Sequence, residues 1–164
     1  MTFEQDILEL AERVLAENRA AGRMIATAES CTGGLTAAAL TEIPGSSDVF
    51  DRGFVTYSYD AKTKLLGVGQ DMLETFGAVS VAVAWAMAKG ALERSQAHVA
   101  VSITGVAGPD GGSAKKPVGT VVFARAVRGQ DPKDGHTEIM TFENSGRAGI
   151  RRDAVRHALG LLLP

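Results

Sequence analysis

The segment that most constrains the fold is a short apolar run followed at once by a polar, glycine-rich turn. Residues 24–28 have the pattern of a buried strand, and residues 29–34 read Glu-Ser-Cys-Thr-Gly-Gly. A helical pattern follows over 35–42 and ends before Pro44. A strand, a turn and a helix in this order begin a βα unit. We therefore expect an α/β domain with residues 30–34 at the carboxyl end of a strand.

The rest of the chain carries alternating strand and helix patterns. Helices are predicted over 3–21, 61–66, 71–76, 81–95 and 147–163, and strands over 50–59, 99–104, 118–127 and 137–142. We expect the last two strands to form an antiparallel pair joined through 129–135. Combined with the βα units, this pattern predicts one domain over residues 1–164, a three-layer α/β/α fold with a mixed sheet.

Charge, cysteine and histidine content exclude several kinds of ligand. The chain has 17 basic and 19 acidic residues, a net charge of −2, so no nucleic-acid partner is expected. Cys31 is the only cysteine in the sequence and cannot form an internal disulfide. The histidines do not form an i, i+4 ligand pair, so we predict neither a metal site nor a cofactor (His98, His136 and His157). The longest apolar stretch, 81–88, is too short to cross a membrane.

Three polar clusters lie at predicted strand ends or in loops, and α/β sheets bind their ligands beyond the carboxyl ends of strands. In 28–34, Ser30 or Cys31 is a candidate nucleophile beside N–H groups that could bind an oxyanion or a phosphate. In 57–62, Lys62 is a candidate base if burial lowers its pKa. The third cluster, 104–112, has four glycines and could bind an anion through its main chain.

Each cluster also has a purely structural interpretation that the residues alone leave open. Ser30 or Thr32 could simply cap the following helix. Lys62 could be an exposed helix lysine, as most lysines are. Residues 104–112 could be an ordinary surface loop, since glycines commonly mark turns. In the same way, Glu29 is more often a solvated carboxylate, or one that orients a helix, than a catalytic acid.

Taken together, the clusters resemble the CinA C-terminal domain family over nearly the whole chain. The motifs that carry the resemblance are Thr27-Ala28-Glu29-Ser30-Cys31-Thr32-Gly33-Gly34, Gly45-Ser46-Ser47, 52–58, 77–80, 102–112 and 116–121. Stand-alone members of that family are nicotinamide-nucleotide amidohydrolases, which convert nicotinamide mononucleotide to nicotinate mononucleotide and ammonia. The chain length leads us to expect this short form, without the N-terminal nucleotide-processing domain of longer CinA proteins.

The resemblance implies a covalent mechanism with a serine nucleophile. Carried over to this sequence, the catalytic residues are Ser30, Tyr57 and Lys62. Lys62, directly or through Tyr57, would take the proton of Ser30, which then attacks the carboxamide carbon of the substrate. We expect the N–H groups of Thr32, Gly33 and Gly34 to contact the substrate and stabilise the oxyanion.

The ribose and 5′-phosphate of a nucleotide substrate require further contacts. Polar groups expected to supply them are Ser46, Ser47, Thr104, Gly105 and Arg147. Arg147 is the candidate for the phosphate because a guanidinium matches it as a planar fork, and Arg151 is its rival. The sequence departs from the family at Tyr59, where members often have Asn, and this change could alter substrate affinity.

A protein of another class remains an alternative: a non-catalytic nucleotide-binding or interaction module of a competence or damage-inducible system. An amidohydrolase for a different small amide is a third possibility. We expect a small-molecule nucleotide as substrate, no membrane partner and a homodimer. Acidic Glu4 and Asp6 stand where a signal peptide has basic residues, and cysteine is scarce, so we predict a cytoplasmic protein.

Overall fold

A computed structural model describes residues 3–164 and contains a five-stranded sheet of order β2-β1-β3-β4-β5. Its strands are β1 (Ile25–Glu29), β2 (Phe50–Val55), β3 (Val99–Gly105), β4 (Thr120–Val127) and β5 (His136–Thr141). Strand β1 is parallel to both of its neighbours, whereas β4 and β5 continue the sheet in antiparallel fashion. The mixed sheet and the antiparallel pair predicted from the sequence are both confirmed.

The parallel strands end level with one another. Glu29, the last residue of β1, lies opposite Val55 of β2 and Ile103 of β3. The turn at 30–34, the segment 56–58 and the long loop from 106 to 119 therefore all leave the sheet at this carboxyl edge. Two of the three polar clusters meet here because β1 and β2 are parallel neighbours, and the third joins them through β3.

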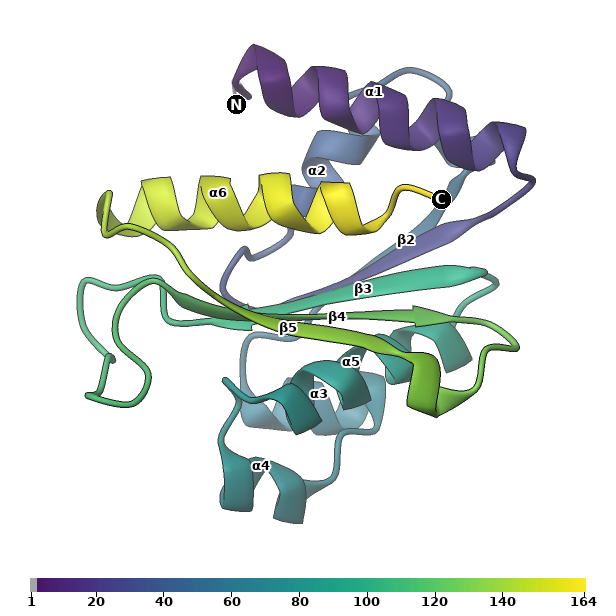
Figure 1. Ribbon diagram of the computed structural model, residues 1–164. Coiled ribbons are helices and arrows are strands. Elements are labelled where there is room, and N and C mark those ends of the chain that lie inside the picture. Colours follow the sequence, from purple (N-terminus) through teal and green to yellow (C-terminus); the bar gives the residue numbers. More distant parts are fainter. Residues whose placement is uncertain (1–2) are drawn as a thin grey trace.

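Helices cover both faces of the sheet (Figure 1). One layer contains α1 (Gln5–Ala20), α2 (Leu35–Thr41) and α6 (Gly146–Leu161), and the other contains α3 (Tyr59–Leu66), α4 (Gln70–Phe76) and α5 (Val81–Glu93). Two short 3₁₀ turns, η1 (Ser46–Asp48) and η2 (Pro132–Asp134), complete the elements. The three-layer α/β/α prediction is confirmed. No helix in residues 3–164 has the length and apolar character needed to span a membrane.

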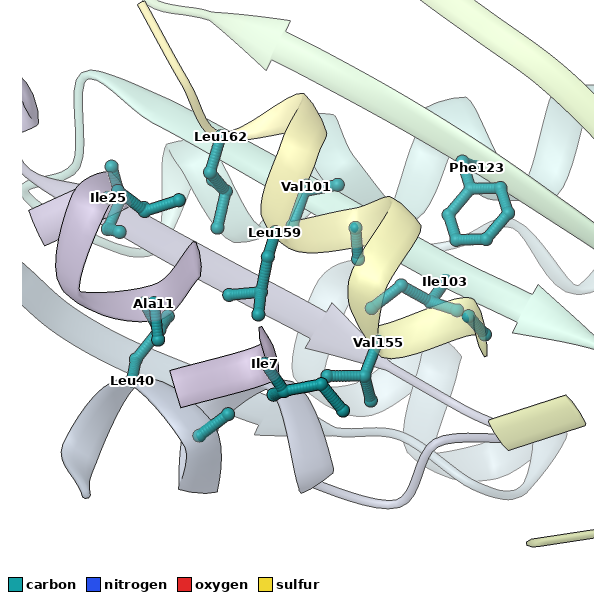
Figure 2. Packing of buried hydrophobic residues seen from close by; sticks show 14 of the residues in the cluster. Ile7, Ala11, Ile25, Leu40, Val101, Ile103, Phe123, Val155, Leu159 and Leu162 are labelled. Carbon is teal, nitrogen blue, oxygen red and sulfur yellow. The ribbon is translucent and has the colours of Figure 1, made fainter. Parts of the chain in front are cut away.

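The core on the α1–α6 side is mostly aliphatic, in keeping with the low aromatic content, and includes the buried ring of Phe123. Leu159 of α6 and Leu162, which directly follows this helix, pack onto Ile25 and Val101 of the sheet (Figure 2). On α1, the buried positions recur every three or four residues, which aligns them on one face (Ile7, Ala11, Val14 and Leu15). Burial of this face holds α1 against α2 and α6.

One predicted boundary is wrong. The strand expected over 50–59 ends at Val55, and α3 begins at Tyr59. Tyr57 and Tyr59 have side chains typical of strands, but Ser58 between them caps α3 by accepting a hydrogen bond from the N–H of Ala61 at 3.0 Å. The early end of β2 turns the chain back so that α3, and Lys62 with it, faces the carboxyl edge.

Candidate active site

The turn after β1 presents Ser30 at the edge of the sheet. The N–H of Ser30 donates to the carbonyl of Ile103 at 2.9 Å, and the N–H of Gly33 donates to the carbonyl of Ser30 at 3.0 Å. Gly33 and Gly34 have φ values of +59° and +94°, a region that glycine adopts without the strain that other residues meet. This pair of left-handed residues lets the chain turn directly into α2.

Glu29 caps the start of α2 with its side chain. Its buried carboxylate accepts hydrogen bonds from the N–H groups of Gly34 at 3.2 Å, Thr36 at 3.0 Å and Ala37 at 2.8 Å. These are the first-turn donors that a helix leaves unpaired, and the carboxylate also complements the positive end of the helix. Glu29 therefore has the helix-orienting role, and because it is buried the alternative of a solvated carboxylate is wrong.

Because Glu29 takes the capping role, the side chain of Ser30 is not used as a helix cap. The residue in the N-cap position of α2 is Gly34, which has no side chain to donate or accept. The interpretation of Ser30 or Thr32 as a simple cap is therefore wrong for α2. The hydroxyl of Ser30 instead accepts a hydrogen bond from Lys62 Nζ at 2.8 Å.

Lys62 is buried to an unusual degree for a lysine, with 1% of its surface exposed. Its Nζ also donates to the carbonyl of Thr56 at 2.8 Å, so both close partners are uncharged. No carboxylate in residues 3–164 forms an ion pair with it. Burial lowers the pKa of Lys62 from 10.5 to about 8, despite an opposing effect of Cys31. The alternative of an exposed lysine is wrong.

Cys31 has the opposite electrostatic character. Burial raises the pKa of its thiol to about 11, so the thiol is protonated at neutral pH. A thiol in that state is a poor nucleophile, because the thiolate is the reactive form. Cys31 is thus a buried thiol next to Ser30 in the chain, and the chemistry available at this edge is that of a hydroxyl next to an amine of lowered pKa.

Tyr57 lies at the mouth of the site, and 62% of its surface is exposed. Its hydroxyl accepts a hydrogen bond from Arg147 Nη2 at 3.0 Å, while Arg147 Nη1 donates to the carbonyl of Gly108 at 2.9 Å. Within residues 3–164, the Tyr57 hydroxyl forms no hydrogen bond with Ser30 or Lys62. Arg147 therefore joins the 57–62 cluster to the loop that follows β3.

Arg151 lies one helical turn beyond Arg147 on α6 but has different partners. Its Nε donates to the carbonyl of Cys31 at 3.0 Å and its Nη2 to the carbonyl of Thr32 at 3.1 Å. Both of these bonds hold the main chain of the turn that carries Ser30. The sequence identified Arg151 only as a rival for a phosphate, and no pattern in the sequence indicated this contact with the turn.

The other predicted binding residues divide into two groups. Thr104 is buried at the carboxyl edge, where its hydroxyl donates to the carbonyl of Ala78 at 2.9 Å, and Gly105 ends β3 beside it. Ser46 and Ser47 lie in η1, just before the first residue of β2, whereas Ser30 follows the last residue of β1. Since β1 and β2 are parallel, one copy of the chain does not bring these two serines to Ser30.

Two further observations complete the site. Tyr59, the departure from the family pattern, accepts a hydrogen bond from the N–H of Ala78 at 3.3 Å through its hydroxyl. It therefore supports the same 77–80 segment that Thr104 holds. Within residues 3–164, histidine, cysteine and carboxylate side chains form no group of three or more that could hold a metal ion.

Fold and site together define a three-layer α/β protein with a buried serine–lysine pair at the carboxyl edge of its parallel strands. Comparison with known proteins then identifies the family. Residues 7–164 match the model of the CinA C-terminal domain, and the chain belongs to the CinA family.

The proteins similar to this chain are of two lengths. A protein of Escherichia coli named nicotinamide-nucleotide amidohydrolase PncC is 48% identical over 160 residues, covering 97% of this chain and 94% of its own. A CinA-like protein of Syntrophobacter fumaroxidans is 51% identical over 155 residues, covering 94% of this chain but 35% of its own. The chain thus spans roughly a third of the length of several longer CinA relatives.

A solved structure supports the fold. The crystal structure of the competence/damage inducible protein CihA from Agrobacterium tumefaciens superimposes with a TM-score of 0.94 at 53% sequence identity. The match covers 99% of this chain and 96% of that one. The fold described above is therefore that of a CinA-type domain along its whole length.

Proposed function

We propose that this protein hydrolyses the carboxamide of nicotinamide mononucleotide, with Ser30 as the nucleophile, and releases nicotinate mononucleotide and ammonia. The observation that carries the proposal is the 2.8 Å contact between Lys62 Nζ and Ser30 Oγ, both buried at the carboxyl edge of the sheet. The name of the Escherichia coli relative, which matches nearly end to end, supports the choice of substrate. A serine paired with a lysine is a known alternative to the serine–histidine–aspartate triad.

The first step needs the neutral form of Lys62. Its amine accepts the proton of Ser30 Oγ, and the oxygen then forms a bond to the carboxamide carbon of the substrate, leaving a tetrahedral oxyanion. We favour direct proton transfer from Ser30 to Lys62 over a relay through Tyr57. Lys62 contacts Ser30, whereas the Tyr57 hydroxyl is hydrogen-bonded to Arg147. Tyr57 then serves the site by holding Arg147 in place.

The second step releases ammonia. Collapse of the oxyanion breaks the carbon–nitrogen bond, and the leaving nitrogen takes the proton that Lys62 received, so that an ester on Ser30 remains. Water then attacks the ester carbon while Lys62 accepts a proton from it, and breakage of the ester returns that proton to Ser30 Oγ. Each proton transfer by a positioned group typically accelerates a reaction by about 10²–10⁴-fold.

The oxyanion requires N–H groups that have no other acceptor. In the turn, the N–H of Ser30 donates to Ile103, that of Gly33 to Ser30, and that of Gly34 to Glu29. Within residues 3–164, the N–H groups of Cys31 and Thr32 have no acceptor, so we propose these two as the oxyanion donors. This choice narrows the expected set of Thr32, Gly33 and Gly34 to Thr32 and adds its neighbour.

The phosphate of the substrate fits Arg147 better than Arg151. Arg147 is exposed at the mouth of the site, with donors beyond the two that bind Tyr57 and Gly108. Arg151 uses its fork on the turn carbonyls. The main chain from Gly105 onwards lies next to Arg147 through Gly108, and we propose that it contacts the ribose end of the nucleotide.

Ammonia release from nicotinamide mononucleotide tests the proposal, with wild type, Ser30→Ala and Cys31→Ala compared. We expect turnover by wild type, loss of turnover in Ser30→Ala, and retained turnover in Cys31→Ala, whose main-chain N–H is unchanged. Wild-type protein that binds the nucleotide without releasing ammonia would instead be the non-catalytic module. Loss of turnover in Cys31→Ala alone would assign the nucleophile to the thiol.

Two sequence-based expectations stay predictions. We expect a homodimer, which sedimentation of the purified protein would detect. We also expect the protein to act in the cytoplasm, where pyridine nucleotides are formed and consumed.

A further inference from the structure

We infer that Arg151 is a positioning residue for the oxyanion site: its guanidinium fixes the two peptide groups that carry the oxyanion donors. This inference rests on the function proposed above and adds a residue to its mechanism. It is based on the paired contacts of Arg151 Nε with the Cys31 carbonyl at 3.0 Å and of Nη2 with the Thr32 carbonyl at 3.1 Å.

Peptide geometry links these carbonyls to the oxyanion donors. In a planar trans peptide, the C=O and the N–H point in opposite directions. The peptide whose carbonyl is that of Cys31 carries the N–H of Thr32 on its other side. By holding this carbonyl toward α6, Arg151 directs the N–H of Thr32 away from the helix.

The next peptide obeys the same rule and provides an internal check. Its carbonyl belongs to Thr32 and contacts Arg151, and its N–H belongs to Gly33. That N–H points away from Arg151 and donates to the Ser30 carbonyl at 3.0 Å, which closes a four-residue turn from Ser30 to Gly33. A turn closed in this way does not pair the N–H groups of its two central residues, Cys31 and Thr32, and within residues 3–164 no other group accepts a hydrogen bond from them.

The positive charge of Arg151 adds an electrostatic effect. Hydrogen bonds in a chain polarise one another, so a guanidinium on a peptide carbonyl strengthens the N–H of the same peptide as a donor. Arg151 is partly shielded from water and lies over the turn, where a Cβ added to Gly33 would come within 3.4 Å of its Nη2. The charge therefore supports the oxyanion through the peptide rather than by direct contact with substrate.

Neighbouring arginines on α6 provide the comparison. Arg147 contacts the mouth of the site and not the turn. Arg152 follows Arg151 directly, but its Nη1 pairs with Glu4 Oε1 at 2.8 Å on α1's side of the domain. Substitution of Arg152 thus controls for loss of an arginine from this helix without disturbing the turn.

The test is steady-state kinetics of ammonia release from nicotinamide mononucleotide by wild type, Arg151→Lys, Arg151→Met and Arg152→Met, with thermal unfolding measured in parallel. Removal of one oxyanion donor commonly lowers kcat by about 10²–10³-fold. Since Arg151 only positions the donors, we expect kcat to fall about 10–100-fold in both Arg151 variants. KM should change less than about threefold, because the ground-state amide binds this site weakly.

If Arg151→Met does not fold, Arg151→Lys is compared with wild type instead. Lysine keeps the positive charge but cannot donate to both carbonyls in the geometry of a guanidinium. A raised KM with unchanged kcat would assign Arg151 to the phosphate and overturn the inference. Unchanged kcat and KM in a folded Arg151→Lys would overturn it as well, and so would an equal loss in Arg152→Met. Wild-type protein without turnover would instead refute the proposed function itself.

Discussion

The lowered pKa of Lys62 leads to a specific dependence of activity on pH. With a pKa of about 8, about a tenth of the Lys62 side chains are neutral at pH 7 and half at pH 8. At the ordinary value of 10.5, the neutral fraction at pH 7 would be about 300-fold smaller. By lowering this pKa, burial provides most of the neutral Lys62 that the proposed first step needs near neutral pH.

We accordingly predict that kcat/KM rises with pH, from about a tenth of its plateau at pH 7 to half of it near pH 8. The sign follows because the base is the deprotonated form, which gains population as pH increases. The measurement is the initial rate of ammonia release between pH 7 and pH 10. This window lies above the second ionisation of a phosphate ester, near pH 6, and below the raised pKa of Cys31 at about 11.

Two variants provide the controls for this profile. Lys62→Met removes the base, and Lys62→Arg replaces it with a group that stays charged throughout the window. Both should lower kcat/KM by about 10²–10⁴-fold and lose the rise near pH 8. A flat wild-type profile from pH 7 to pH 10, or substantial activity in a folded Lys62→Met, would remove Lys62 from the mechanism.

Three further predictions concern groups around the site and in the fold. Tyr57→Phe should raise KM several-fold with little change in kcat, since the hydroxyl holds Arg147; a large fall in kcat would instead indicate a proton relay. Glu29→Gln should destabilise the protein by about 3 kcal/mol in chemical unfolding, because the charged cap of α2 is lost. Burial acts to raise the pKa of Glu138, but hydrogen bonds from His157 and His136 keep it below its ordinary value. The stability lost in Glu138→Gln at pH 6, about 1 kcal/mol, should therefore shrink as pH falls below 4.5, as thermal unfolding would show.

The fold was largely predictable because its elements are regular and local. The helix of α1, the strand β1 and the cap of α5 at Ser80 follow from periodicity and from capping chemistry. The end of β2 was not predictable from propensity. The residues after Val55 favour strands by type, and a single cap at Ser58 overrides that preference.

The candidate site was predictable only in part. The resemblance to a family selected Ser30 and Lys62, and the structure brings the two together. Which end of a parallel strand a loop occupies depends on topology, so the loop motif alone did not reveal that Ser46 and Ser47 precede β2, away from Ser30 in the same copy of the chain. The contact of Arg151 with the turn joins residues about 120 positions apart in the sequence, and no local sequence pattern predicts a contact between residues so far apart.

The central claim is that Ser30, activated by Lys62, forms an ester with the substrate. Hydroxylamine tests it most directly, because this nucleophile competes with water for an acyl-enzyme. Wild-type protein turning over nicotinamide mononucleotide in hydroxylamine should yield the hydroxamate of nicotinate mononucleotide together with ammonia, and Ser30→Ala should yield neither. Formation of nicotinate mononucleotide and ammonia with no hydroxamate at any hydroxylamine concentration would contradict the account and indicate direct attack by water.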